Sequence, residues 1–252
     1  MQIKGYVILI FLLFCLACSN KNPAPIEELE NQYPPEFVFK SIKIPESLRQ
    51  NQDSLAQVVV GYVNMYNEME KYVPLLNPSP DSGLSEYTST EYGPPWVESW
   101  KTNEGFLVLL LVSGNETKYD WEVKFWGKDS INDIYYNKWI LLTASNLLGD
   151  ENGGIELYEP NSKNIDVQYF WISYADLYNI VRIYRIINFV DNNHELSIDM
   201  NFHEDLSGEL SITKMGEERF YVELKISWNS LGKGEWWRYN EIGEVIEAGS
   251  WD

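Results

Sequence analysis

The chain has 252 residues, with 19 lysines and arginines against 38 aspartates and glutamates, and its formal net charge is -19. A chain this acidic repels the phosphates of nucleic acids, which excludes DNA and RNA as partners. The length is sufficient for one sizeable domain or two small ones.

The chain begins with a single cation, Lys4, followed by an apolar segment from Tyr6 to Leu16. A membrane-spanning helix needs about 20 residues, and this shorter segment has the length of a signal-peptide core. The small residue Ala17 comes next and is followed by Cys18 and a polar stretch. This order of charge, apolar core, small residue and cysteine resembles the lipobox of bacterial lipoprotein signal peptides.

The resemblance implies that residues 1–17 are a signal peptide and that Cys18 is lipidated through its sulfur as the first residue of the mature chain. The membrane would then be a partner through the lipid anchor, and the protein would belong to the bacterial cell envelope. Ser19 stands where an Asp favours retention in the inner membrane, so the resemblance points to the outer membrane. A mature chain with one cysteine cannot form an internal disulfide, and the domain must be held by its core.

Two other interpretations of this region stay open. Cys15 and Cys18 form a C-x-x-C pair, which in a folded polar site is typical of redox centres or zinc ligands. Here the two thiols lie in or beside an apolar leader. An ordinary signal cleaved after Ala17 would leave Cys18 unmodified.

Residues 18–44 are rich in Pro, Asn and Glu and lack periodicity, so we expect a flexible tether. From Pro45 onward the pattern changes to that of an amphipathic helix over residues 45–73, which ends at Pro74. Its apolar stripe, at steps of three and four with a gap at Gln52, consists of Leu48, Leu55, Val59, Tyr62, Tyr66, Met69 and Val73.

A long loop is predicted over residues 74–105, which contain many turn and breaker residues. It carries four aromatic residues, Tyr87, Tyr92, Trp96 and Trp100. These rings either pin the loop to the body of the domain or form a rim that contacts a ligand.

Everything after Gly105 has the pattern of strands separated by short turns. In Phe220–Trp228 the alternation puts Phe220, Val222, Leu224, Ile226 and Trp228 on one face. The predicted strands are 106–112, 118–125, 134–143, 154–158, 167–174, 178–190, 195–202, 209–213, 219–228, 235–239 and 244–248.

The expected fold is therefore mainly β. About ten strands in series without helical spacers indicate a large antiparallel meander, either a curved sheet or barrel-like. The N-terminal amphipathic helix would pack on it, in a single domain over residues 45–252. Trp236 and Trp237 are adjacent, so on a strand they point to opposite faces, and Trp236 is added to the candidate contact residues.

The sequence provides no specific signal for catalysis, a cofactor or a metal. The two histidines, His194 and His203, are predicted on opposite faces of one strand, where they cannot share a zinc ion. With 38 acidic residues, carboxylate pairs at the spacing used by glycosidases arise by chance. We therefore expect no catalytic residue, no metal and no cofactor.

These observations favour a non-enzymatic envelope lipoprotein that binds an apolar small molecule, a lipid or a partner protein. Binding would use an aromatic-rich cavity or rim that includes Tyr87, Tyr92, Trp96, Trp100 and Trp236. The alternative is a glycan-binding module or glycoside hydrolase that uses exposed Trp and Tyr together with carboxylates. A third class is an assembly subunit that uses free sheet edges.

Overall fold

The structure is a computed structural model that describes residues 35–78, 95–115, 117–147, 152–175, 180–190 and 193–252. Residues Pro34–Asp252 form one compact unit. No helix within the described ranges is long and apolar enough to cross a membrane.

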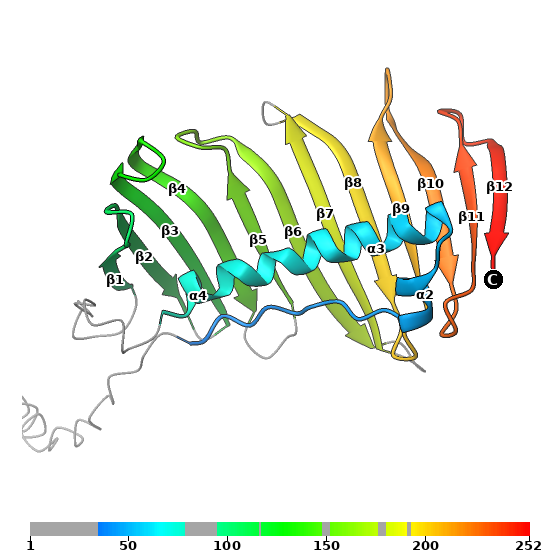
Figure 1. Ribbon diagram of the computed structural model, residues 1–252, viewed down its shortest axis with the longest axis horizontal. Helices are drawn as coiled ribbons and strands as arrows, with labels where there is room; N and C mark the ends of the chain where they lie inside the picture. The colour runs from blue at the N-terminus through cyan, green and yellow to red at the C-terminus, as the bar shows by residue number, and fades with distance from the viewer. Residues whose placement is uncertain (1–34, 79–94, 116, 148–151, 176–179, 191–192) are drawn as a thin grey trace, which may run out of the picture. The chain divides into compact units, whose positions relative to one another are not determined.

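A single antiparallel sheet of twelve strands makes up most of this unit, and each strand pairs with the strands before and after it in sequence (Figure 1). The prediction of a mainly β, antiparallel meander is confirmed. The sheet is open rather than barrel-like, with β1 and β12 at the two ends of the strand order. The strands are β1 Trp96–Lys101, β2 Leu107–Gly114, β3 Lys118–Asp129, β4 Ile134–Leu147, β5 Gly153–Tyr158, β6 Ile165–Ala175, β7 Ile180–Val190, β8 Asn193–Phe202, β9 Gly208–Met215, β10 Phe220–Trp228, β11 Gly234–Tyr239 and β12 Val245–Trp251.

Strand β1 lies inside the region predicted as a loop, which corrects both the extent of that loop and the count of about ten strands. It pairs with β2 from Trp96↔Val112 to Lys101↔Leu107. Its middle inward-facing residue is Glu98, whose exposed fraction is only 4%. A carboxylate at a core position interrupts the apolar alternation by which strands are recognised in sequence.

The predicted helix over residues 45–73 is in fact broken into several pieces. Asp53 starts the longest one, because its side chain accepts hydrogen bonds from the backbone N–H groups of Leu55 at 2.8 Å and Ala56 at 3.4 Å. Pro74 does not end the helical region, since a proline is tolerated in the first turn of a new helix. The main helical region is thus residues 54–76 and follows an extended segment and a short helix. The pieces are α2 Glu46–Gln50, α3 Ser54–Asn67, the 3-10 helix η1 Glu68–Tyr72 and α4 Val73–Leu76.

Helix α3 lies across one face of the sheet, called here the covered face (Figure 1). Tyr66 of α3 makes edge-to-face contacts with Tyr169 and Tyr184 at 5.9 and 5.1 Å between ring centroids. Beneath it, one row of paired residues crosses all twelve strands, and its members on β1 to β10 are all buried. The row is Trp96, Val112, Trp121, Ala144, Ile155, Tyr169, Ile186, Ile198, Ile212, Leu224, Arg238 and Glu247.

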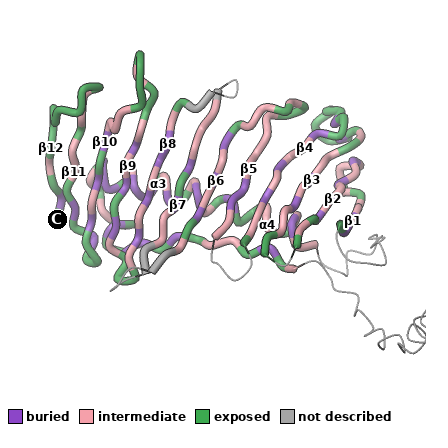
Figure 2. The backbone as a smooth tube through the Cα atoms, turned by 180° about the vertical axis from the view of Figure 1, so that it is seen from behind, coloured by how far each residue is buried: buried purple, intermediate pink, exposed green. Residues whose placement is uncertain are grey.

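Burial follows this arrangement along the chain. Buried residues recur along the strands, whereas exposed ones gather in the turns and along β12 (Figure 2). Along β10 the predicted alternation holds for Leu224, Ile226 and Trp228, which are buried. It fails at Phe220, which is 43% exposed, because the register with β9 shifts between Val222 and Leu224.

The N-terminal segment, residues 35–45, is held on the domain by three asparagine side chains. Each amide accepts from the N–H and donates to the C=O of one residue, as a neighbouring strand would. Asn77 pairs with Phe37 at 2.8 and 2.8 Å, Asn67 with Ile42 at 2.7 and 2.9 Å, and Asn146 with Val38 at 3.2 and 3.4 Å. Phe37, Ile42 and Ile44 are buried, so the last part of the predicted tether packs on the sheet.

Six aromatic residues of the sheet lie opposite glycines in neighbouring strands. A Cβ atom added at any of these glycines would come within 3 Å of the paired ring, so a larger residue would displace it. An aromatic ring over a glycine restores the contacts that the missing side chain leaves out. The pairs are Gly114–Tyr119, Gly153–Trp171, Gly154–Phe170, Gly208–Trp228, Gly234–Trp251 and Gly249–Trp236.

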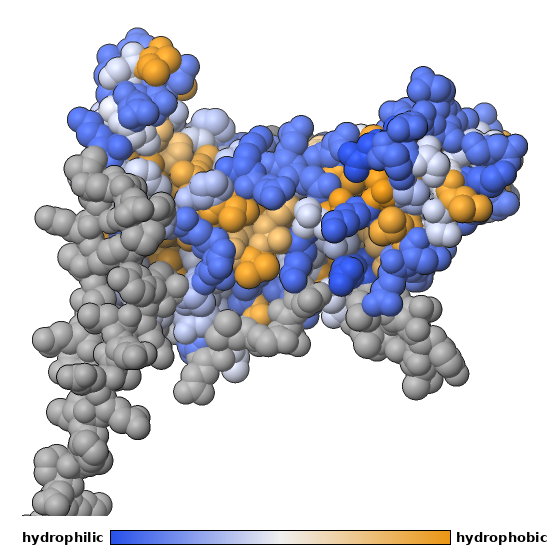
Figure 3. Space-filling model, turned by 60° about the horizontal axis from the view of Figure 1, so that its bottom comes forward, coloured by the Kyte–Doolittle hydropathy of each residue, from blue (hydrophilic) through white to orange (hydrophobic). Residues whose placement is uncertain are grey.

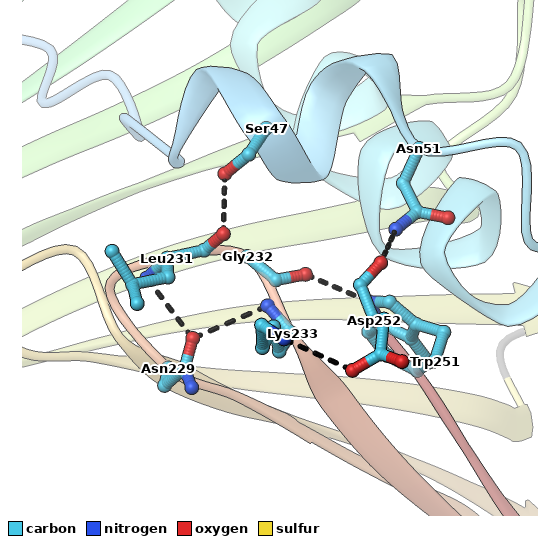
Figure 4. A network of polar contacts seen from close by, with 8 residues as sticks. All are labelled: Ser47, Asn51, Asn229, Leu231, Gly232, Lys233, Trp251 and Asp252. Atoms are coloured by element: carbon cyan, nitrogen blue, oxygen red, sulfur yellow. Dashed lines mark hydrogen bonds and ion pairs between the residues drawn. The ribbon is translucent and has the colours of Figure 1, made fainter.

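Helix α2 is tied to the β10–β11 turn and to the end of the chain (Figure 4). Ser47 Oγ donates to Leu231 O at 2.6 Å, and Asn51 Nδ2 donates to Asp252 O at 3.0 Å. Trp251 Nε1 donates to Gly232 O at 2.7 Å. At Gly232 the chain has φ +79, and a Cβ atom there would lie 2.6 Å from the backbone nitrogen of Leu48.

We expect Gly232→Ala to destabilise the protein more than Gly243→Ala. Gly243 also has a positive φ, of +88, but nothing lies within 4 Å of its Cβ position. The left-handed conformation alone costs about 1–2 kcal/mol in Gly243→Ala. In Gly232→Ala, overpacking against α2 adds about 1–3 kcal/mol. Chemical denaturation measures both values, and equal losses would contradict the described contact with α2.

Candidate functional site

A groove runs beside helix α3, between this helix and strands β9 to β11. Its volume is about 450 Å³, and its lining is mostly apolar. The lining residues are Ser54, Leu55, Val58, Gly61, Tyr62, Met65, Ile212, Leu224 and Arg238. The groove forms because the buried stripe of α3 points into the sheet, whereas the residues on the shoulder of the helix stay half-buried above Ile212 and Leu224.

Gly61 widens this groove at the middle of the helix. A glycine in a helix interior costs about 1 kcal/mol relative to alanine. No atom lies within 4 Å of the position of a Cβ at Gly61, so packing does not require the glycine. The missing side chain leaves open space in the groove. A helix-destabilising residue that packing does not require is a local conflict of the kind expected at functional sites.

A cation stands at one end of the groove. The guanidinium of Arg238 lies 5.9 Å from the centroid of the Trp236 ring, and its Nε is 3.7 Å from the carboxylate of Glu247. Arg238 is also where the buried row of the covered face changes from apolar to charged residues. The groove therefore combines an apolar body with one positive group at its rim.

Tyr62 provides a second polar group in the groove wall. Burial is the main reason that its pKa lies above the ordinary value of 10.0, with a smaller opposing effect from Lys214. Lys214 itself is paired with Glu223, with Nζ at 2.9 Å from Oε1. At neutral pH the Tyr62 hydroxyl is therefore protonated and can donate a hydrogen bond.

Among the described residues of the predicted binding rim, Trp236 is not brought together with Trp96 and Trp100. Trp96 is buried at 5.9 Å from the Tyr119 ring, and Trp100 is half-buried against the core. Trp236 also packs against the core, but it lies on β11, whereas Trp96 and Trp100 lie on β1 at the other end of the strand order. Trp236 pairs with Ile226 on the covered face, which places the adjacent Trp237 on the open face as predicted.

Three predicted residues lie outside the described residues, namely Tyr87, Tyr92 and Cys18. The side chain of His194 also lies outside them, so the predicted separation of the two histidines stays a prediction. Gly61, Met65 and Arg238 were not among the predicted site residues. The one available signal was the glycine in the middle of an otherwise good helix pattern.

The open face of the sheet carries a different, polar trough of about 490 Å³. Its central carboxylate, Glu156, accepts hydrogen bonds from Thr143 Oγ1 at 3.1 Å, Tyr158 OH at 3.0 Å and Gln168 Nε2. The neighbouring Glu122 is paired with Lys124 at 2.5 Å. These carboxylates are occupied by protein groups, and nothing here resembles the acid in an apolar pocket that a hydrolase needs.

Tyr66 is an unusual element of the core beneath α3. Its side chain is fully buried, and its hydroxyl has no hydrogen-bond partner among the described residues. Burial raises its pKa far above the ordinary value of 10.0, and the nearby Tyr184 adds to this effect. A buried hydroxyl without a partner costs about 1–3 kcal/mol of stability.

Replacing Tyr66 by Phe is therefore expected to raise the free energy of unfolding by about 1 kcal/mol or more. Because the folded-state pKa is raised above the unfolded value, ionisation of Tyr66 does not affect the free energy of unfolding below about pH 10 and lowers it progressively above that pH. The alkaline loss of stability should be shallower in Tyr66→Phe. Denaturation at pH 7 and pH 11 tests both expectations, with the half-buried Tyr62→Phe as the pH 7 control, expected to change by less than about 0.5 kcal/mol. A lower stability of Tyr66→Phe at pH 7 would contradict the absence of a partner.

A comparison with models of known protein families finds none that matches this chain. A comparison with curated protein sequences also finds no match.

Proposed function

We propose that this protein is a non-enzymatic, membrane-anchored envelope lipoprotein that binds an apolar ligand with an acidic head group in the groove beside α3. The observation that carries the proposal is the open space at Gly61 in a mostly apolar groove beside α3. A volume of about 450 Å³ lies within the range of small-molecule sites, about 300–1,000 Å³.

The chemistry of the lining supports this ligand class. Val58, Met65 and Leu224 would contact an apolar body, and methionine adapts well to varied apolar shapes. Arg238 at the rim would pair with a carboxylate or similar head group. A free fatty acid has this combination of groups.

The glycan alternative receives less support from the described residues. Trp96 is buried and Trp236 packs against the core, so neither forms an exposed platform for a sugar ring. The polar trough on the open face offers carboxylates that are already paired. We therefore favour the apolar ligand.

The anchoring part of the proposal rests on the resemblance of the N-terminal sequence to a lipobox. A lipid on Cys18 would attach the domain to the cell envelope, and Ser19 favours the outer membrane. An apolar ligand site on a membrane-anchored domain is positioned to exchange ligand with the bilayer.

Filling the groove is the direct test of the proposal. We expect Gly61→Leu to weaken binding of dansylaminoundecanoic acid at least about tenfold, because the new side chain occupies the space that the ligand needs. Fluorescence titration of the purified chain measures this binding. Arg238→Gln should weaken it about two- to fivefold, as loss of an exposed ion pair does, without changing the binding of the uncharged N-phenyl-1-naphthylamine.

The matched control is Asn64→Leu, which adds the same side chain on the exposed side of the same helix, outside the groove lining. It should leave binding unchanged. If Gly61→Leu and Asn64→Leu bind the probe as the native chain does, the groove is not the ligand site.

Lipidation is tested separately by Cys18→Ala and Cys15→Ala. Cys18→Ala should move the protein out of the membrane fraction, because the modified sulfur is lost, whereas Cys15→Ala should stay with the membrane. Cell fractionation followed by mass spectrometry of the N-terminal peptide makes the measurement. Equal behaviour of the two variants would refute the lipobox interpretation.

A further inference from the structure

The hairpin formed by the ends of β3 and β4 carries exposed apolar side chains at its tip. It lies at the upper left of the sheet in Figure 1. Four large side chains here are exposed by 40% or more, namely Trp126, Ile131, Ile134 and Tyr135. Figure 3 keeps this end of the sheet on the left and shows an apolar group at its projecting end. Exposed apolar groups that gather in this way mark surfaces that contact a protein or a membrane.

The opposite face of the same hairpin has its own aromatic core. The rings of Tyr136 and Trp139 are stacked at 5.4 Å between centroids, and Phe125 meets them edge to face at 5.4 and 5.7 Å. Tyr136 and Trp139 are buried. Since side chains alternate along a strand, Trp126 and Tyr135 point away from this core. The exposed rings therefore stand on a packed support and do not result from a loosely folded hairpin.

The turn at the tip is also held in place. Asp129 is only 2% exposed, and its carboxylate accepts hydrogen bonds from the N–H groups of Ile131 and Asn132, both at 2.9 Å. Asn132 Nδ2 donates to the second carboxylate oxygen at 2.9 Å. Ile131, which is 72% exposed, is thus presented by a fixed turn. A preorganised tip loses little conformational freedom when it makes a contact.

A β-bulge places a cation over the exposed tryptophan. The register of β3 with β4 shifts between Phe125 and Gly127, so that Asn137 and Lys138 both lie opposite Trp126. Lys138 has φ 52, an uncommon conformation for a residue with a side chain. Its Nζ lies 5.1 Å from the centroid of the Trp126 ring. Bulges often re-aim a side chain, and this one joins an apolar ring to a long aliphatic stem with a charged end.

The charge of the hairpin differs from that of the chain. Residues 124–138 contain three lysines and two aspartates, so their formal charge is 3 − 2 = +1, whereas the chain carries -19. Within the hairpin, Lys128 Nζ pairs with Asp133 at 2.7 Å. An acidic chain is repelled by the phosphates of lipid head groups, and this repulsion is relieved at the hairpin.

The kinds of residue at the tip favour a lipid bilayer as the partner. Trp and Tyr are enriched at membrane–water interfaces, because their rings are apolar and carry a polar group. A lysine beside them packs its stem on apolar surface and keeps its ammonium group in the head-group layer. Ile131 and Ile134 add apolar side chains that suit the boundary between head groups and acyl chains.

We propose that the β3–β4 hairpin inserts its tip into the interfacial layer of a lipid bilayer. Trp126, Ile131 and Tyr135 enter this layer, and Lys138 meets the phosphates of the head groups. The inference rests on the proposed function only for its location, since a lipid on Cys18 would hold the domain close to a bilayer.

The length of the chain permits both contacts with one bilayer. Val38 pairs with Asn146, near the end of β4 that is opposite to the hairpin. Strand β4 has 14 residues, which corresponds to about 45 Å. The twenty residues from Cys18 to Val38 span at most about 65 Å. An anchor at Cys18 therefore does not keep the hairpin away from the membrane.

Site-specific fluorescence tests the contact. Cys15 and Cys18 are the only cysteines of the chain, so the variant with both replaced by Ser accepts a nitrobenzoxadiazole label at one introduced cysteine. The label is placed at the tip in Ile131→Cys. The matched control is Ile246→Cys, whose native side chain is 65% exposed on β12, at the other end of the strand order. The probes are vesicles of dioleoylphosphatidylcholine, without and with a nitroxide-labelled lipid.

We expect the label at position 131 to gain fluorescence at least about twofold with vesicles and to be quenched by the nitroxide lipid, because the tip leaves water. The label at position 246 should show neither change. Added to Ile131→Cys, Trp126→Ser should weaken vesicle binding about fivefold, since its ring no longer contributes apolar area. Ile172→Ser is the control for this variant, because the native residue is 49% exposed on β6, compared with 47% for Trp126. It should leave vesicle binding unchanged.

Equal responses of the labels at positions 131 and 246 would overturn the proposal, as would equal vesicle binding with Trp126→Ser and Ile172→Ser. The N-terminal segment is the same in both labelled chains, so any contact that it makes with the vesicle affects both alike. The anchor is tested separately by fractionation of Cys18→Ala. Failure of the anchor and failure of the hairpin contact thus give different results.

Discussion

The structure depends on covering one face of an open sheet. Twelve strands joined in sequence order place an apolar row from Trp96 to Leu224 on the same face, and no strand is left to cover it. Helix α3 and the N-terminal segment provide this cover, because their buried residues belong to the same core as the strands. The hydrophobic gain from this contact is proportional to the apolar area removed from water. Since a narrow cover lies on a wide sheet, grooves remain along its margins.

The groove beside α3 is marked by a residue that suits its backbone poorly. Gly61 stands in a helix, where alanine would be more favourable. Packing does not explain this choice, since no atom lies within 4 Å of the Cβ position of Gly61. Local conflicts of this kind are expected where a sequence serves a ligand as well as a fold.

The sequence was sufficient to identify β2 to β12, because their alternation and turn residues are local signals. It was not sufficient for β1, where Glu98 occupies a core position, or for the position of Phe220, where a register shift moves the side chain outward. Pairs such as Gly234–Trp251 depend on strand register, which no single strand specifies. The groove beside α3 was out of reach for the same reason, since it joins Gly61 to Arg238 across the fold.

The three asparagine contacts of the N-terminal segment also have a mechanical meaning. Tension applied to the domain from its N-terminal side reaches the segment 35–45 first. Asn77 and Asn146, at Phe37 and Val38, would then bear the load before Asn67 does. Each contact consists of two hydrogen bonds, which must break together for the chain to peel away. Under such a pull, the asparagine side chains would thus be the first contacts of the domain to bear the load.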